Sequence, residues 1–206
     1  MSDKVSRRSV FQHATVLGAA SAIPVRSLGQ LPAGAAYRNL SAAEARTLEA
    51  VVARLIPSDA TGPGALEAGA VTYIDRALGD ALNRYRDVYT RGLAALEQYA
   101  RATAGAAFAE TTPEQQDAML TALEQNRVEG FEPDSAAFFD LMLTHTREGT
   151  FSDPYYGGNR NFIGWDMVGY PGIRLAVGPQ EQDMDATLEP TDLSAYGLSM
   201  FDEGDA

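Results

Sequence analysis

The segment from Thr150 to Gly172 places the strongest constraint on how this chain can fold. It reads TFSDPYYGGNRNFIGWDMVGYPG and contains five glycines, two prolines and six aromatic residues, including the chain's only tryptophan. Glycine and proline at this density prevent a continuous helix, and aromatic rings at this density cannot all remain in water. We therefore expect a long irregular segment that is buried against the rest of the fold or against another molecule. Irregular segments of this length in compact domains are usually functional.

The chain before this segment shows the three-to-four-residue spacing of apolar side chains that is typical of helices. Ser41 and Glu44 have the spacing of a capping box, and the apolar residues that follow predict a helix that ends at Ile56, before a proline. Residues 58–64 have the composition of a turn. Two more periodic stretches predict helices over about 66–79 and 81–104. The tyrosines of the second stretch fit core packing better than a ligand box.

Two further helix starts have clear signals. The sequence TPEQ from Thr112 supplies an N-cap, a proline at the first helical position and a capping-box glutamine. Asp134 or Ser135 can cap a last helix, and Gly149 is expected to end it in a left-handed conformation. The sequence therefore predicts an all-α bundle of about five helices with a long irregular, glycine- and aromatic-rich C-terminal segment.

The composition excludes several kinds of chemistry. The 206 residues include no cysteine, which excludes disulfides, cysteine-ligated metal sites, iron–sulfur clusters and a thiol nucleophile. The net charge of -12 and the absence of a basic patch argue against binding to nucleic acid or to an anionic membrane face. Redox chemistry that needs cysteine side chains therefore cannot take place on this chain.

The first 30 residues differ from the rest of the chain. Arg7 and Arg8 precede a short uncharged apolar run and a small-residue triplet at Ala20–Ala22, and this order resembles a twin-arginine export signal. It predicts a signal peptide and linker over residues 1–30, recognition by the twin-arginine translocase, and a location in the bacterial periplasm or at the periplasmic face of the inner membrane. The alternative is an ordinary amphipathic helix. Folded export is typical of proteins that carry a cofactor, yet this chain has no evident means to hold one.

The C-terminal end is acidic. No basic residue follows Arg174, while eight acidic residues do. Such a tail is expected to be solvated and mobile. We therefore divide the chain into the signal at 1–30, a helical domain at 31–178 that includes a docking segment at 150–172, and an acidic tail at 179–206.

Several short motifs together resemble a known family. They are HTREG from His145, FSDP from Phe151, YGGN from Tyr156, GW from Gly164 and GYPG from Gly169. Earlier matches are LIPSD from Leu55, GPGA from Gly62 and YID from Tyr73. These motifs, within about residues 40–175, are similar to the small subunit of membrane-associated gluconate 2-dehydrogenase, the subunit 3 family, which includes the small subunits of related sugar and polyol dehydrogenases.

The resemblance implies that the chain is an accessory subunit that does not itself catalyse a reaction. It implies that the chain is the partner of a large FAD-dependent flavoprotein of the glucose-methanol-choline type. A multihaem cytochrome c, which contains haem c, often joins this complex. In such complexes the small subunit stabilises the large one and carries it across the membrane. The chain itself would hold no cofactor and no metal, and FAD would belong to the partner.

Two sets of residues are candidates for this role. Arginine with tyrosine and tryptophan dominates binding hot spots, so the expected partner interface is Arg147, Phe151, Tyr155, Tyr156, Arg160, Trp165 and Tyr170. The expected structural motif is His145, Glu148, Asp153, Pro154, Gly157, Gly158 and Asn159. Arg174 is a further candidate anchor. For the three arginines, pairing with acids such as Asp153 or Asp166 is an equally good interpretation.

The residues offer little support for catalysis by the chain. His145 with Glu148 could be pictured as a metal pair or a general base, but one histidine and one carboxylate leave a metal under-ligated. We favour a hydrogen bond from His145 to a backbone carbonyl near its helix end, and a turn-forming role for Asp153. The alternative to the subunit interpretation is a stand-alone periplasmic small-ligand-binding protein or hydrolase that uses the same segment as a pocket.

Overall fold

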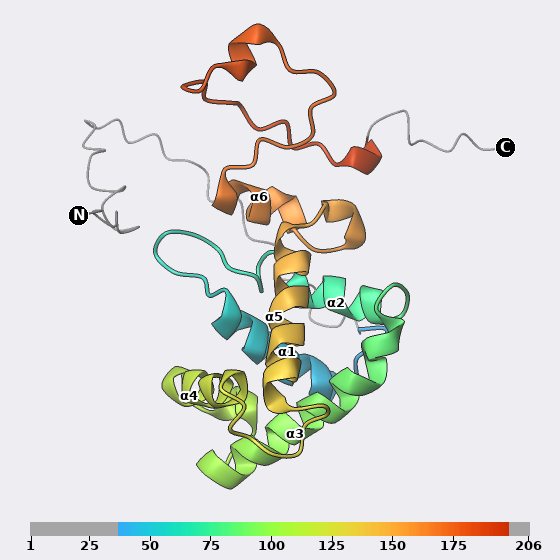
Figure 1. Ribbon diagram of the computed structural model, residues 1–206, viewed down its shortest axis with the longest axis vertical. Helices are drawn as coiled ribbons and strands as arrows, with labels where there is room; N and C mark the ends of the chain where they lie inside the picture. Colours follow the sequence, from blue (N-terminus) through green and yellow to red (C-terminus); the bar gives the residue numbers. More distant parts are fainter. Residues whose placement is uncertain (1–36, 198–206) are drawn as a thin grey trace, which may run out of the picture. The chain divides into compact units, whose positions relative to one another are not determined.

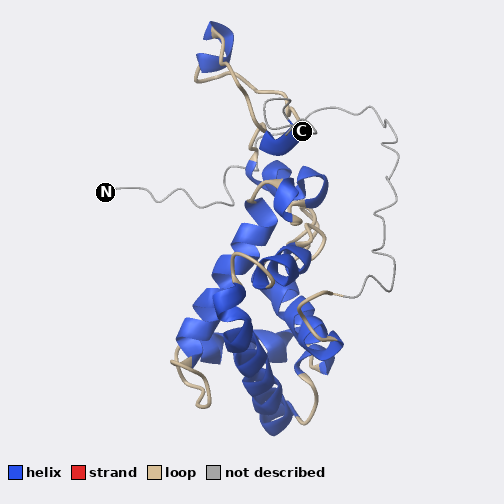
Figure 2. Cartoon of the chain, turned by 90° about the vertical axis from the view of Figure 1, so that its right-hand side faces the viewer, coloured by secondary structure: helices blue, strands red, loops and turns tan. Residues whose placement is uncertain are grey.

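Six α-helices and several short 3-10 turns make up the described part of the chain. The computed structural model describes residues 37–197; Arg7, Arg8 and the last nine residues lie outside them. The α-helices are α1 (Ala42–Leu55), α2 (Ala70–Leu78), α3 (Arg86–Ala104), α4 (Pro113–Glu124), α5 (Ser135–Phe151) and α6 (Ile163–Val168). Figure 2 shows helices and loops but no strand in these residues. The predicted all-α class is confirmed.

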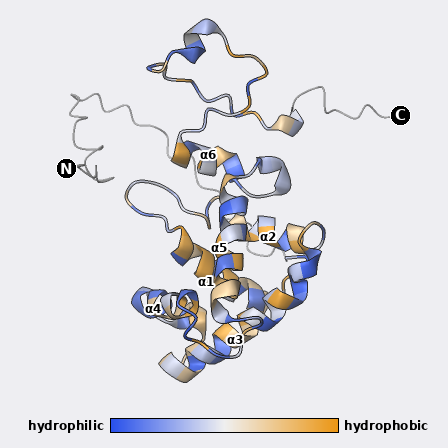
Figure 3. Ribbon diagram, in the orientation of Figure 1, coloured by the Kyte–Doolittle hydropathy of each residue, from blue (hydrophilic) through white to orange (hydrophobic). Residues whose placement is uncertain are grey.

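Helix α5 is the central element of the bundle. It contacts α1, α2 and α4, and the short α6 lies at its C-terminal end (Figure 1). The core contains aliphatic residues of the first three helices together with Phe138 and Met142 of α5, all almost fully buried. Figure 3 shows hydrophobic residues of α1 where that helix meets α5. Tyr89 is fully buried and Tyr85 and Tyr99 are half-buried, as expected for core and boundary packing.

The predicted caps are present in the structure. Ser41 and Thr112 each accept a hydrogen bond from the backbone N–H three residues later, and in each case the return bond of the capping box is formed. Asp134 caps α5 by accepting a hydrogen bond of 2.8 Å from the N–H of Ala137. Each such cap is worth about 1 kcal/mol, because it satisfies N–H groups that the helix itself leaves unpaired.

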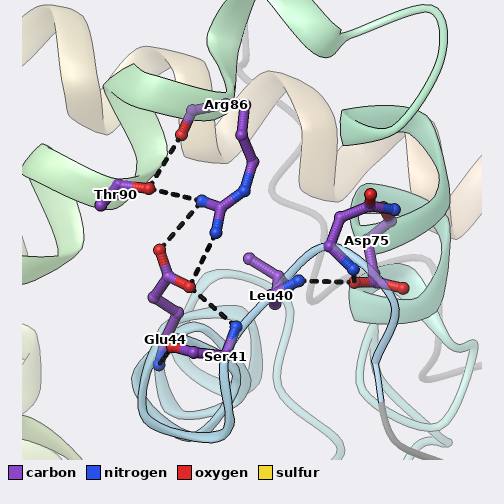
Figure 4. Close-up of polar contacts among 7 residues, drawn as sticks. Leu40, Ser41, Glu44, Asp75, Arg86 and Thr90 are labelled. Carbon is purple, nitrogen blue, oxygen red and sulfur yellow. Dashed lines mark hydrogen bonds and ion pairs between the residues drawn. The ribbon is translucent and has the colours of Figure 1, made fainter.

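A partly buried ion pair joins α1 to α3. The carboxylate of Glu44 accepts two hydrogen bonds of 2.9 Å from Arg86 and one of 2.8 Å from the backbone N–H of Ser41 (Figure 4). Burial acts to raise the pKa of Glu44, but these hydrogen bonds outweigh it and lower the pKa from its ordinary 4.5 to about 2. Arg86 also donates a hydrogen bond to the hydroxyl of Thr90.

A buried carboxylate on α2 holds the chain that leads into α1. Asp75 is 3% exposed and accepts hydrogen bonds from the backbone N–H groups of Arg38, Asn39 and Leu40, at 2.9, 2.8 and 2.9 Å. Figure 4 shows the bond to Leu40. Hydrogen bonds to an ionised acceptor are about twice as strong as neutral ones, so this group fixes where the bundle begins.

Two predicted helix starts are too early. The predicted helix over 66–79 begins at Ala70 instead, because Gly69 has a positive φ of 81° and the carbonyl of Ala68 accepts a hydrogen bond from the N–H of Arg160. The predicted helix over 81–104 begins at Arg86 after a 3-10 turn at Asn83–Tyr85. Contacts with the rest of the fold therefore override local helical periodicity at both positions.

The predicted end of the last helix is also wrong. Gly149 lies inside α5, which continues to Phe151 and is capped by Ser152. A Cβ atom on Gly149 would lie 2.8 Å from Cα of Ala70 and 2.9 Å from its carbonyl oxygen. The glycine is required because α2 and α5 pack in close contact here, rather than for a left-handed cap.

Candidate functional site

The segment after α5 folds back and packs its backbone against the last turn of that helix. A Cβ atom on Gly158 would overlap the carbonyl oxygen of Gly149, and one on Gly164 would overlap the carbonyl oxygen of Thr150. Both glycines are buried. The glycines of this segment therefore permit main chain to approach main chain. Of the two expected alternatives, the backbone of the segment packs against the bundle, while Tyr155, Tyr156 and Tyr170 stay exposed.

Asn159 holds the two ends of this fold together. It is fully buried, its side-chain Nδ2 donates to the carbonyl of Ser152 and its Oδ1 accepts from the N–H of Gly164, both at 2.8 Å. Its own N–H donates to the carbonyl of Gly149 at 2.8 Å. Asn159 also has a φ of 41°, in the left-handed region that asparagine tolerates better than most residues. Both parts of the amide are thus used.

Trp165 is a part of this interior rather than an exposed anchor. It is 5% exposed, and its Nε1 donates to the carbonyl of Phe151 at 3.0 Å. Its ring lies 5.2 Å from Phe162 and 4.9 Å from Tyr170, measured between centroids. The predicted interface residue therefore makes its main contacts within the chain, with Phe151 half-buried beside it.

His145 is buried in an aromatic environment. It is 3% exposed, its Nδ1 lies 3.0 Å from the hydroxyl of Tyr89, and its ring lies 5.3 Å from that of Tyr85. The predicted hydrogen bond to a backbone carbonyl is replaced by this bond to Tyr89. Burial lowers the pKa of His145, while the charge of Glu148 opposes that shift. The imidazole is thus held neutral as a core group.

The pairing of His145 with Glu148 is not a metal site in this fold. Glu148 is exposed, and its carboxylate accepts a hydrogen bond of 3.0 Å from the hydroxyl of Tyr73. Burial and then Glu148 raise the pKa of Tyr73 to about 12. Within residues 37–197 no three histidine or acidic side chains lie close enough to hold a metal ion together.

Asp153 forms the predicted turn and also binds the tail. Its carboxylate accepts a hydrogen bond of 2.9 Å from the N–H of Tyr155, which caps the 3-10 turn that Pro154 begins. It also accepts bonds from the hydroxyl of Ser194, at 2.6 Å, and from the N–H of Ala195, at 2.8 Å. This part of the tail, which we expected to be solvated, is therefore in contact with the docking segment.

Three tyrosines complete this contact. The rings of Tyr155 and Tyr196 are stacked with centroids 3.7 Å apart, and the hydroxyls of Tyr156 and Tyr196 lie 2.8 Å apart. Further back, the N–H of Thr191 donates to the carbonyl of Pro171 at 2.9 Å. Residues 191–196, which we call the tail turn, are thereby held against the docking segment.

The three candidate arginines have different environments. Arg174 pairs with Glu181 at 2.6 Å. Arg160 is half-buried and packs its guanidinium beside Gly69. Arg147 is exposed and forms no ion pair with any residue in the described range 37–197. None of the three pairs with Asp153 or Asp166, so the acids suggested by the sequence are wrong, although intramolecular pairing itself occurs for Arg174.

Exposed apolar side chains gather in one part of the chain. Among residues 37–197, those with a large apolar side chain and an exposed fraction above one third, other than Leu66, all lie between Tyr155 and Tyr196. They are Tyr155, Tyr156, Met167, Val168, Tyr170, Leu175, Val177, Met184, Leu193 and Tyr196. Clusters of exposed apolar residues mark interaction sites on soluble proteins.

A groove of about 580 Å³ lies within this cluster. Its aromatic lining comes from Phe151, Tyr156, Trp165, Tyr170 and Tyr196. A second cavity, of about 520 Å³, lies between α1 and α3 and contains the Glu44–Arg86 ion pair. The first has the aromatic, apolar walls of a binding groove, whereas the second is lined largely by charged and polar side chains.

Sequence reasoning missed the contribution of the tail to this site. Tyr196 and Ser194 contact residues about forty positions earlier, and no local pattern encodes such a contact. A tyrosine within an otherwise acidic tail was the one available signal. The close approach of Gly149 to Ala70 was missed for the same reason, since a helical glycine resembles a cap in sequence.

One known protein family matches the helical part of this chain. No helix in the described part of the chain has the length and hydrophobicity to cross a membrane. Searches of curated proteins and of solved structures found no match. The family model described as gluconate 2-dehydrogenase subunit 3 matches residues 42–172, from the start of α1 to the end of the docking segment. The chain therefore belongs to the gluconate 2-dehydrogenase subunit 3 family.

Proposed function

We propose that this chain is the non-catalytic small subunit of an exported FAD-dependent dehydrogenase that acts on gluconate, a sugar or a polyol. It binds and stabilises a large flavoprotein of the glucose-methanol-choline type, and its twin-arginine segment directs export of the folded pair to the periplasm. The observation that carries the proposal is the concentration of exposed apolar side chains between Tyr155 and Tyr196 on a chain of this family. FAD belongs to the partner, and a multihaem cytochrome c completes some complexes.

The site consists of buried polar groups and exposed apolar side chains, and this separation supports the proposal over catalysis by the chain. Asn159, Trp165 and His145 are buried and use their polar atoms within the fold. The exposed members of the site are tyrosines and aliphatic residues, with Arg147 nearby in sequence. Rigid buried groups beneath an exposed aromatic surface are the features of a docking face.

Co-expression tests the proposal. A tagged chain is produced in its native host, and the flavoprotein that copurifies with it is identified by its flavin absorbance and by mass spectrometry. That flavoprotein is then produced with and without this chain. We expect export, flavin content and dehydrogenase activity to require the chain. Equal amounts of exported, flavin-loaded, active enzyme without the chain would show that the proposal is wrong.

The export role has a separate test. The double variant Arg7→Lys with Arg8→Lys keeps the charge but removes the paired guanidinium groups that a twin-arginine signal supplies. We expect both this chain and its flavoprotein to remain in the cytoplasm, as measured by cell fractionation. The matched control is Arg26→Lys, which also lies in the first 30 residues and should leave export unchanged. Normal export of the double variant would contradict the signal assignment.

The alternative, a stand-alone small-ligand-binding protein or hydrolase, predicts a different outcome. Such a chain would purify without a flavoprotein as a stable monomer, and titration calorimetry would detect binding of a sugar. A chain of the proposed type is expected to self-associate or precipitate when isolated, because the exposed apolar cluster lacks its partner.

A further inference from the structure

The aromatic groove is built from two segments that are far apart in sequence. One wall comes from the docking segment, through Tyr156, Trp165 and Tyr170, and the other from the tail turn, through Ala195 and Tyr196. The tail turn is held by the carboxylate of Asp153 and by the stacked tyrosine pair. Without the tail turn the groove would lack one side. The acidic tail is therefore a structural part of the surface and not only a solvated extension.

The rings that line the groove remain accessible to another molecule. Tyr156, Tyr170 and Tyr196 are 47%, 41% and 40% exposed, and Val168 on the same groove is 61% exposed. Trp165 forms the buried floor. Exposed aromatic rings around a buried floor can enclose one apolar side chain of a partner, which is the arrangement typical of interface hot spots.

The two segments that form the groove carry mainly negative charge. Asp153 lines the groove, and the exposed Asp166 and Asp192 lie on the docking segment and on the tail turn, respectively. From residue 161 to residue 197 the only basic residue is Arg174, which pairs with Glu181. No cation in this stretch is left to balance the acids. A partner face with positive charge is therefore complementary to this one.

We propose that the groove between the docking segment and the tail turn binds a large apolar side chain of the flavoprotein, presented between lysine or arginine residues. This inference rests on the proposed function and specifies the chemistry of its partner surface. The apolar side chain provides the short-range contact with Tyr156 and Tyr196. The flanking cations meet Asp166 and Asp192 and accelerate association, since complementary charge acts mainly on the association rate.

The first experiment tests the tail wall. Association of the purified flavoprotein with this chain is measured by biolayer interferometry, with Tyr196→Ser as the variant and Leu66→Ser as the matched control. Leu66 is 37% exposed, close to the 40% of Tyr196, but lies outside the exposed apolar cluster and does not line the groove. We expect Tyr196→Ser to raise the dissociation rate at least about tenfold, as for a hot-spot residue, and Leu66→Ser to leave it unchanged.

The second experiment tests the charges. The double variant Asp166→Asn with Asp192→Asn is compared with Asp140→Asn with Glu129→Gln, two exposed acids of the bundle outside the groove. We expect the first pair to lower the association rate about fivefold at low salt and to reduce its dependence on ionic strength, and the second pair to change neither. Thermal unfolding of all variants checks that each is folded.

The outcomes separate this inference from the proposed function. If the flavoprotein binds but neither Tyr196→Ser nor the aspartate pair alters its kinetics, the inference is wrong and the proposed function stands. Failure to recover any flavoprotein overturns both. A dimer of this chain that Tyr196→Ser abolishes would identify a second copy as the occupant and overturn the inference. Faster binding by a chain that ends at Gly197 would do the same, because residues 198–206 would then be the occupant.

Discussion

Two buried polar residues, Asn159 and Asp75, each make several hydrogen bonds that hold separate parts of the backbone together. Asn159 satisfies one carbonyl, one N–H and its own backbone position at a fully buried site. Asp75 does the same for three consecutive N–H groups. Each is polar, buried and fully paired, so replacing either leaves several buried groups without partners.

Asn159→Ala is expected to lower the free energy of unfolding by about 3 kcal/mol, because the half-buried carbonyl of Ser152 and the buried N–H of Gly164 both lose their partners. The matched control is Asn161→Ala. Asn161 also has a positive φ, of 52°, but its side chain is exposed. Urea unfolding of the two variants separates the buried hydrogen bonds from the backbone conformation. An equal loss of unfolding free energy in both variants would show that the left-handed backbone conformation, and not the buried hydrogen bonds, explains the effect.

His145 makes stability depend on pH in a defined direction. Its pKa is lowered in the folded chain, so below about 6.5 the unfolded chain binds more protons than the folded one. We therefore expect this contribution to be fully present near pH 7.5 and to be lost as pH falls below 6.5. Urea unfolding at pH 7.5 and 5.5 measures it. In His145→Gln the difference between the two pH values should shrink; an unchanged difference would assign it to other groups.

At the scale of elements, close packing of α2 against α5 decides where helices begin and end. Gly149 is the position where the two backbones come closest. Helix propensity alone predicts that Gly149→Ala stabilises α5, by up to about 1 kcal/mol. Because the new Cβ would meet backbone atoms of Ala70, we expect the opposite sign.

The expected loss for Gly149→Ala is about 2 kcal/mol in the free energy of unfolding, which is typical of overpacking. The control is Thr144→Ala, at an exposed position of the same helix, where propensity should dominate and stability should rise by a few tenths of a kcal/mol. Thermal unfolding of both variants gives the two signs directly. Stabilisation by both would mean that α2 and α5 can move apart at no cost.

The sequence predicted elements well where their signals are local. Ser41, Thr112 and Asp134 cap helices as expected, because a cap depends on residues three positions apart. The same reasoning failed at Gly149 and at Ala70, because the deciding contacts, of Gly149 with Ala70 and of Arg160 with Ala68, join residues that are far apart in the sequence. The aromatic segment was predicted to be buried, but which of its rings face inward was not: only the fold separates buried Trp165 from exposed Tyr156 and Tyr170.

At the scale of the whole molecule, the separation of buried from exposed rings predicts two classes of variant within the docking segment. Tyr156→Ala and Tyr170→Ala are expected to weaken association with the flavoprotein by about 2 kcal/mol each, with little effect on folding. Trp165→Ala is expected to lower the free energy of unfolding by about 3 kcal/mol or more, because it removes a buried ring and its bond to Phe151. Calorimetric unfolding and binding kinetics on all three variants distinguish the classes. Losses of association below about 0.5 kcal/mol at both tyrosines would contradict the docking face.

The carboxylate of Asp75 has a mechanical consequence. Any tension applied along the chain from residues before Arg38 reaches the bundle through three hydrogen bonds that end on one side chain. All three bonds end on a side chain of α2 and not on α1, whose first residue follows Ser41. A pull on the N-terminal end is therefore transmitted to α2 and the core before it reaches α1.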